Sequence, residues 1–153
     1  MVDATMGSGA RATPWHLWLV GALALLWNGF GAYDFLMTTT RGEAYFRESG
    51  MTQPMIDYFN GMPGWMYVPW TLGVWGAVIG TVLLLLRMRL AVPVFGLSFL
   101  GALVSLIYQK VIDPSPPPPP AMAAMEWMPY VIVVIAAFLL WYAWSMGKKG
   151  VLR

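Results

Sequence analysis

The 153-residue chain contains no cysteine and a single histidine, His16. The lack of cysteine excludes disulfides, cysteine-based zinc or iron–sulfur sites and a thiol nucleophile. A lone histidine excludes a haem or metal site that needs two imidazole ligands. Charge is scarce, because Asp, Glu, Lys and Arg make up 10% of the residues, against about 25% in a typical soluble domain. The net charge of +2 is too small and too scattered for nucleic-acid binding, so we expect neither a nucleic-acid partner nor a cofactor.

Apolar side chains are what the chain has in excess. Hydrophobic residues make up 59% of the sequence, and the mean hydropathy is +0.62. A soluble domain of this size has too high a surface-to-volume ratio to bury so much apolar area, whereas a lipid bilayer covers it. The composition therefore predicts an integral membrane protein that is surrounded by the lipid bilayer.

Four apolar stretches of about 20 residues each are long enough, as helices, to cross a hydrocarbon core of about 30 Å. Backbone polar groups in lipid must be satisfied within their own segment, so we expect helices rather than strands. The stretches lie at about 15–37, 66–86, 90–109 and 127–146. The sequence thus predicts an all-α, integral membrane four-helix bundle over residues 13–146. A flexible tail is expected at 1–12 and a basic tail at 147–153.

Basic residues are divided unequally between the two sides of the predicted bundle. With four spans, both termini and the 87–89 turn lie on one side, which carries six basic residues against three on the other. The six are Arg11, Arg87, Arg89, Lys148, Lys149 and Arg153, and the three are Arg41, Arg47 and Lys110. The positive-inside rule then predicts that both termini are cytoplasmic and that the protein lies in a bacterial inner membrane.

The two connections on the outer side differ in composition. The first, about 38–65, contains Thr52, Pro54 and Gly61 at the spacing that starts and stops a short amphipathic helix. We expect this helix to lie on the membrane surface. The second connection contains five consecutive prolines, 116–120, which favour a stiff polyproline II spacer.

Polar residues within or near the predicted spans are the candidate functional residues. Asn28 lies near the middle of the first span, where an amide either bonds a neighbouring helix or serves a functional site. Asp34 and Lys110 end the first and third spans at about the same depth, so we expect them to form an ion pair. The whole candidate cluster consists of Asn28, Tyr33, Asp34, Tyr108, Gln109 and Lys110.

Small residues recur at helical spacing in the second and third spans. Such residues let helices approach closely in lipid. We interpret them as packing positions inside the bundle, with a dimer interface or a solute groove as alternatives. They are Gly73, Gly76 and Gly80 in the second span and Gly101 and Ser105 in the third.

Three methionines, Met122, Met125 and Met128, follow the proline run at three-residue intervals. Thioethers are soft ligands for Cu(I), so these residues are weak candidates for a copper site. Methionine also fills irregular apolar gaps, and neither cysteine nor an outer histidine accompanies the three. We therefore expect no metal site here.

One segment of the first span, residues 27–38, has the sequence WNGFGAYDFLMT. Further blocks are DYFNGMPGW at 57–65, GVWG at 73–76 and LLWYA at 139–143. Together they make most of the chain similar to a family of small four-span bacterial membrane proteins, which sometimes carry the label "sugar transporter". The resemblance implies the four-span architecture and makes a sugar-like solute one functional hypothesis.

Three classes of function are compatible with the sequence. The first is a non-enzymatic accessory or assembly subunit of a larger membrane complex, which the lack of catalytic motifs favours. The second is a small-solute transporter that acts as an oligomer. The third is a membrane enzyme or a copper-handling protein. We expect the first, with another membrane protein or a second copy of the chain as the partner.

Overall fold

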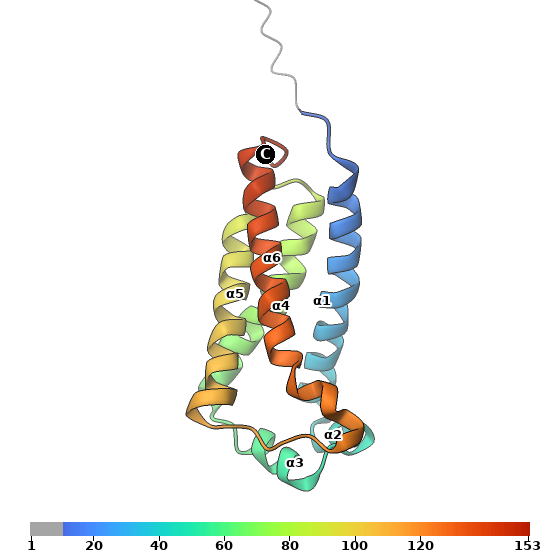
Figure 1. The fold of residues 1–153 in the computed structure, drawn as a ribbon, viewed down its shortest axis with the longest axis vertical. Coiled ribbons are helices and arrows are strands. Elements are labelled where there is room, and N and C mark those ends of the chain that lie inside the picture. Colours follow the sequence, from blue (N-terminus) through green and yellow to red (C-terminus); the bar gives the residue numbers. More distant parts are fainter. Residues whose placement is uncertain (1–10) are drawn as a thin grey trace, which may run out of the picture.

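The computed structural model describes residues 11–153 and shows a long helical bundle with small helices at one end (Figure 1). Four of its helices are long and apolar enough to cross a membrane. They are α1 (Trp15–Arg41), α4 (Tyr67–Leu85), α5 (Ala91–Ile107) and α6 (Met128–Lys148). Residues 11–153 contain no strand. The predicted all-helical class and the four apolar spans are confirmed.

Shorter elements connect the spans on one side of the bundle. Between α1 and α4 the chain forms α2 (Glu43–Glu48), α3 (Gln53–Asn60) and the 3-10 turn η1 (Gly64–Met66). The π-helical turn η2 (Tyr108–Ile112) continues α5, and the 3-10 helix η3 (Pro120–Glu126) precedes α6. We refer to α2, α3, η1 and residues 113–126 together as the cap.

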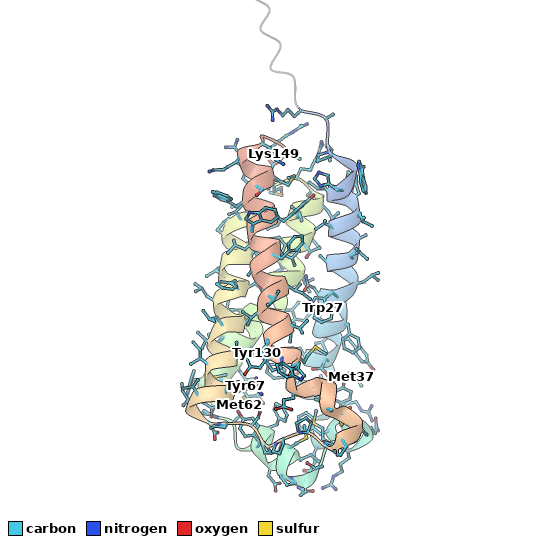
Figure 2. All side chains as sticks on the ribbon, in the orientation of Figure 1. Trp27, Met37, Met62, Tyr67, Tyr130 and Lys149 are labelled. Carbon is cyan, nitrogen blue, oxygen red and sulfur yellow. The ribbon has the colours of Figure 1, made fainter. Side chains whose placement is uncertain are left out.

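The bundle has two chemically different ends. Figure 1 shows the start of α1 and the C-terminus at one end and the cap at the other. Figure 2 places Lys149 at the first end and Met37 and Met62 towards the second. We call the first the basic end, because six basic residues lie there, and the second the cap end. The six are Arg11, Arg87, Arg89, Lys148, Lys149 and Arg153.

The helices are arranged so that α1 packs on α4, α4 on α5 and α5 on α6. In Figure 1, α1 and α5 lie at opposite sides of the bundle. The turn between α4 and α5 is tight, and Arg87 adopts a left-handed φ of 60° in it. The Met88 N–H donates to the Leu83 carbonyl at 2.9 Å, which closes the end of α4 before the chain reverses.

Glycine allows α4 and α5 to approach each other closely. A Cβ added to Gly101 would lie 2.4 Å from the Pro69 carbonyl oxygen, and one added to Gly76 would lie 3.1 Å from the Ser98 Cβ. The Ser98 hydroxyl donates across this contact to the Gly73 carbonyl at 2.7 Å. Gly80 faces the Phe95 ring, whereas the Ser105 hydroxyl bonds to Gly101 within its own helix. We call the contact of Gly73, Gly76 and Gly101 with the facing helix the glycine seam.

The other two spans bury narrower faces. On α1 the buried residues form one stripe of mostly small side chains, Leu17, Gly21, Ala24, Asn28 and Ala32. On α6 the buried residues lie in the half nearer the basic end, and they are Leu139, Tyr142, Ala143 and Met146. The fully buried residues of α6 therefore lie near the basic end, and the partly buried Ile135 packs against the same core from the other half.

The predicted helix after Thr52 is present as α3, and its position on the membrane surface stays a prediction. Its apolar residues Met55 and Ile56 are buried inside the protein, at 6% and 1% exposure. The reason is α2, which the sequence did not predict and which supplies the buried Phe46. The Phe46 and Phe59 rings lie 5.5 Å apart, so the apolar face of α3 is covered by the cap itself.

The segment 147–153, predicted as a basic tail, turns back onto the bundle. Gly150 adopts a φ of 72°, and the Val151 N–H donates to the Met146 carbonyl at 3.0 Å, so the chain turns back after α6. Val151 and Leu152 are buried, and the Arg89 N–H donates to the Arg153 carbonyl at 2.8 Å. The chain end is thus bound to the α4–α5 turn. Most of the predicted tail at 1–12 lies outside the described residues.

Replacing Gly101 by alanine should force α4 and α5 apart, because the added Cβ meets backbone atoms of Pro69 and Gly73 that cannot rotate away. We expect Gly101→Ala to lower stability in detergent by about 1–3 kcal/mol. Gly96→Ala on the same helix is the matched control, because nothing lies within 4 Å of its added Cβ. That control should be neutral, or stabilising by up to about 1 kcal/mol. Equal unfolding temperatures for the two variants would contradict the glycine seam.

Candidate functional site

Asn28 connects α1 to α4 in the middle of the bundle. Its side-chain Nδ2 donates to the Thr81 Oγ1 at 3.0 Å and to the Ala77 carbonyl at 3.3 Å. The Thr81 hydroxyl in turn donates to the Ala77 carbonyl at 2.7 Å. Asn28 is 8% exposed and Thr81 is 0% exposed. Both amide hydrogens therefore serve helix–helix contact, which is a common use of asparagine in membrane helices.

Asp34 is bonded to the cap. The Tyr45 hydroxyl on α2 donates to its Oδ1 at 2.7 Å. This hydrogen bond to the carboxylate, followed by burial, raises the pKa of Tyr45 to about 12. The interaction joins the end of α1 to the cap, and it gives Asp34 a neutral partner in place of a cation.

A second tyrosine pair holds the start of the proline segment. The Tyr108 hydroxyl donates to the Asp113 Oδ2 at 3.1 Å, and the Tyr58 hydroxyl of α3 donates to the Asp113 carbonyl at 2.8 Å. Burial and, after it, the Asp113 charge raise the pKa of Tyr58 to about 12. Asp113 therefore ties the end of α5 to α3. From there the segment crosses the cap end towards η3 (Figure 1).

The predicted ion pair between Asp34 and Lys110 is wrong. The ion pairs of residues 11–153 are Arg41–Glu48 and Arg47–Glu43, which lie in or next to the cap. Lys110 instead lies over the Tyr130 ring, with its Nζ 5.6 Å from the ring centroid. The physical reason is the helix order, because α1 and α5 pack on α4 from different sides.

The six candidate polar residues do not form one site. Across residues 11–153, no side-chain hydrogen bond or ion pair joins any two of them. Tyr33 is 53% exposed on α1, and the Gln109 carbonyl accepts the Ser115 N–H at 3.0 Å. The structure places Asn28 in the bundle and distributes the other residues around the cap end.

Two polar contacts at the basic end have no signal in the sequence. The His16 Nδ1 and the Tyr142 hydroxyl form a short hydrogen bond between α1 and α6, and the Arg87 guanidinium donates to the Thr13 hydroxyl at 2.7 Å. These partners are 126 and 74 residues apart in the chain, so no local pattern signals them.

Candidate metal ligands are not gathered in the described part of the chain. No group of three or more His, Asp or Glu residues there is close enough to hold a metal ion. Met122 and Met125 are partly exposed on η3, and Met128 begins α6. A Cβ added to Gly50 would lie 3.8 Å from the Met122 sulfur, so Met122 packs against the chain just after α2.

Comparison with known proteins adds no relative. No family model matches the chain, and neither the curated proteins nor the solved structures contain a match. The family resemblance of residues 27–38 stays a prediction.

Raising the pH should weaken the contact between α1 and the cap. An unfolded tyrosine loses its proton near pH 10, whereas Tyr45 in the fold keeps its proton up to about pH 12. The folded state therefore holds more protons in this window, and the stability that Tyr45 contributes is lost as the pH rises from about 10 to about 12. The measurement is tyrosinate absorbance in detergent, where Tyr45→Phe should remove one late-titrating group. Tyr33→Phe is the control, and identical titration curves for the two variants would contradict the assignment.

Proposed function

We propose that the protein is a non-enzymatic accessory subunit of a larger complex in a bacterial inner membrane. A transmembrane helix of the partner would pack against the cap-side half of α6. The observation that carries the proposal is the exposure of this half, because no residue from Met128 to Phe138 is buried.

The cap-side half of α6 presents an almost continuous apolar surface. Its large exposed side chains include Tyr130, Val131, Ile132, Val134 and Phe138, and Val134 is 67% exposed. The opposite half of the same helix buries four residues against the rest of the bundle. The cap-side half is only partly covered by the described chain, so a helix of another chain has room to pack there.

Two glycines of α1 support a partner as well. A Cβ added to Gly29 or Gly31 would meet nothing within 4 Å. Glycine inside a helix is less favourable than alanine by about 0.5–1 kcal/mol, and in the glycine seam close packing offsets this. Gly29 and Gly31 have no such packing inside the described chain, and a helix of another protein would use one of the two for close approach, because they point to different sides of α1.

The use of the polar residues supports a non-enzymatic role. Asn28, Asp34 and Tyr108 are each bonded to a residue that holds a helix or the cap in place. Each of these hydrogen bonds joins two elements of the fold or fixes the start of the proline segment, which is a structural use of the side chain.

The distribution of charge supports a cytoplasmic location for the basic end. Every acidic residue of the described chain lies at the cap end, and six basic residues lie at the other. The acidic residues are Asp34, Glu43, Glu48, Asp57, Asp113 and Glu126. By the positive-inside rule the basic end faces the cytoplasm.

Photo-crosslinking in the native membrane tests the proposed partner. A photoreactive amino acid at Val134 should give a discrete adduct with another protein, whereas one at Leu100 on α5 should give lipid adducts. Leu100 is the matched control because it is an exposed apolar span residue, at 56%. Lipid adducts alone at Val134 would overturn the proposal. If the only adduct has twice the 17.0 kDa mass of the chain, the protein has crosslinked to a second copy of itself, and this would favour the oligomeric transporter instead.

Thiol labelling tests the orientation. The chain has no native cysteine, so an introduced cysteine is the only residue of the chain that a thiol reagent labels. In intact spheroplasts, Ser115→Cys should react with an impermeant thiol reagent, because residue 115 lies in the cap. Lys149→Cys should react only after the membrane is opened. Labelling of Lys149→Cys in sealed cells would reverse the orientation.

A further inference from the structure

Two hollows adjoin each other between α5 and α6 near the basic end. The first, of about 380 Å³, is lined by Phe99, Ala137, Leu140, Trp141 and Trp144. The second, of about 270 Å³, is lined by Arg89, Val92, Trp144, Gly147 and Lys148. Trp144 lines both hollows, and we refer to the two together as the α5–α6 groove.

The α5–α6 groove changes character along its length. One part is apolar, and the part at the basic end carries Arg89 and Lys148. Lys148 is held at the junction, because its Nζ lies 4.0 Å from the Trp144 ring centroid. Arg89 is held by its Nε, which donates to the Leu152 carbonyl at 3.2 Å.

Neither of these two cations pairs with an acidic side chain in the described chain. Neither Arg89 nor Lys148 belongs to an ion pair of residues 11–153, and the acidic residues there lie at the opposite end. The charge of the groove is therefore complementary to an anion that comes from outside the protein.

The length of the groove matches one leaflet of a bilayer. From Ala137 to Lys148 the helix rises by about 16 Å, which is about half of a hydrocarbon core of about 30 Å. We propose that the α5–α6 groove binds one anionic phospholipid. Its phosphate contacts Arg89 and Lys148, and one acyl chain lies along Trp144, Trp141 and Phe99 towards the membrane centre.

Gly147 keeps the groove open between the charged and apolar parts. A Cβ at this position would lie 4.0 Å from the Val92 Cγ2, which is ordinary contact, so the fold tolerates a side chain there. The remaining atoms of a leucine would extend into the groove. Gly147→Leu therefore removes space for the acyl chain and leaves both cations in place.

Native mass spectrometry of the full chain in neutral detergent tests the proposal. The delipidated protein is mixed with phosphatidylglycerol or with phosphatidylcholine of the same acyl chains. We expect phosphatidylglycerol to bind more tightly, and Lys148→Gln to lower its affinity by about fivefold. Lys149→Gln is the matched control, because the neighbouring lysine does not line the groove. Its affinity should stay unchanged, whereas Gly147→Leu should lower the affinity for phosphatidylglycerol.

Several outcomes would overturn the site. Equal binding of the two lipids would remove the role of charge, and equal losses in Lys148→Gln and Lys149→Gln would indicate diffuse attraction to the basic end. Displacement of phosphatidylglycerol by millimolar inorganic phosphate would show an ion-binding site without a role for the acyl chain. None of these results depends on the partner proposed above, which crosslinking at Val134 tests separately.

Discussion

Close approach of α4 and α5 at the glycine seam is the contact on which the other helices depend. Lipid provides no hydrophobic force between helices, so association relies on van der Waals packing and on hydrogen bonds between backbones and short polar side chains. Gly73, Gly76 and Gly101 let the backbones meet, and Ser98 adds a hydrogen bond to the Gly73 carbonyl. The remaining spans dock on this pair, with α1 on α4 and α6 on α5.

The same principle closes the middle of the bundle. Along its buried stripe α1 presents mostly small side chains, and Asn28 fits against Thr81 and Ala77 because its neighbours in the stripe are small. At the cap end, Phe46, Met55, Ile56 and Met66 are each buried. Two hollows lie on the outside, between α5 and α6. The molecule thus has a closed interior and open outer faces, which suits a protein that acts through lipid and partner contacts.

Sequence reasoning predicted what depends on composition and local pattern. Length and hydropathy located the four spans, and Thr52 and Gly61 located α3, because these signals act within one segment. Sequence reasoning was wrong where contacts between segments far apart in the chain decide the structure. The ion pair of Asp34 with Lys110 could be excluded only by knowing that α1 and α5 lie on different sides of α4. Asp34 bonds instead to Tyr45 on α2, a helix for which the sequence pattern gives no clear signal. The docking of Val151 and Leu152 likewise depends on the α4–α5 turn, which is far away in the sequence.

Water accessibility at Thr81 tests most directly whether the interior is closed. Thr81 is 0% exposed and bonds to Asn28, and cysteine is close to threonine in size. If the bundle is closed, Thr81→Cys in the membrane will resist impermeant thiol reagents applied from either side, while Glu126→Cys in the cap reacts readily. Labelling of Thr81→Cys at a rate similar to that of Glu126→Cys would contradict the closed interior. Protection from that labelling by a solute would place Asn28 on a transport pathway.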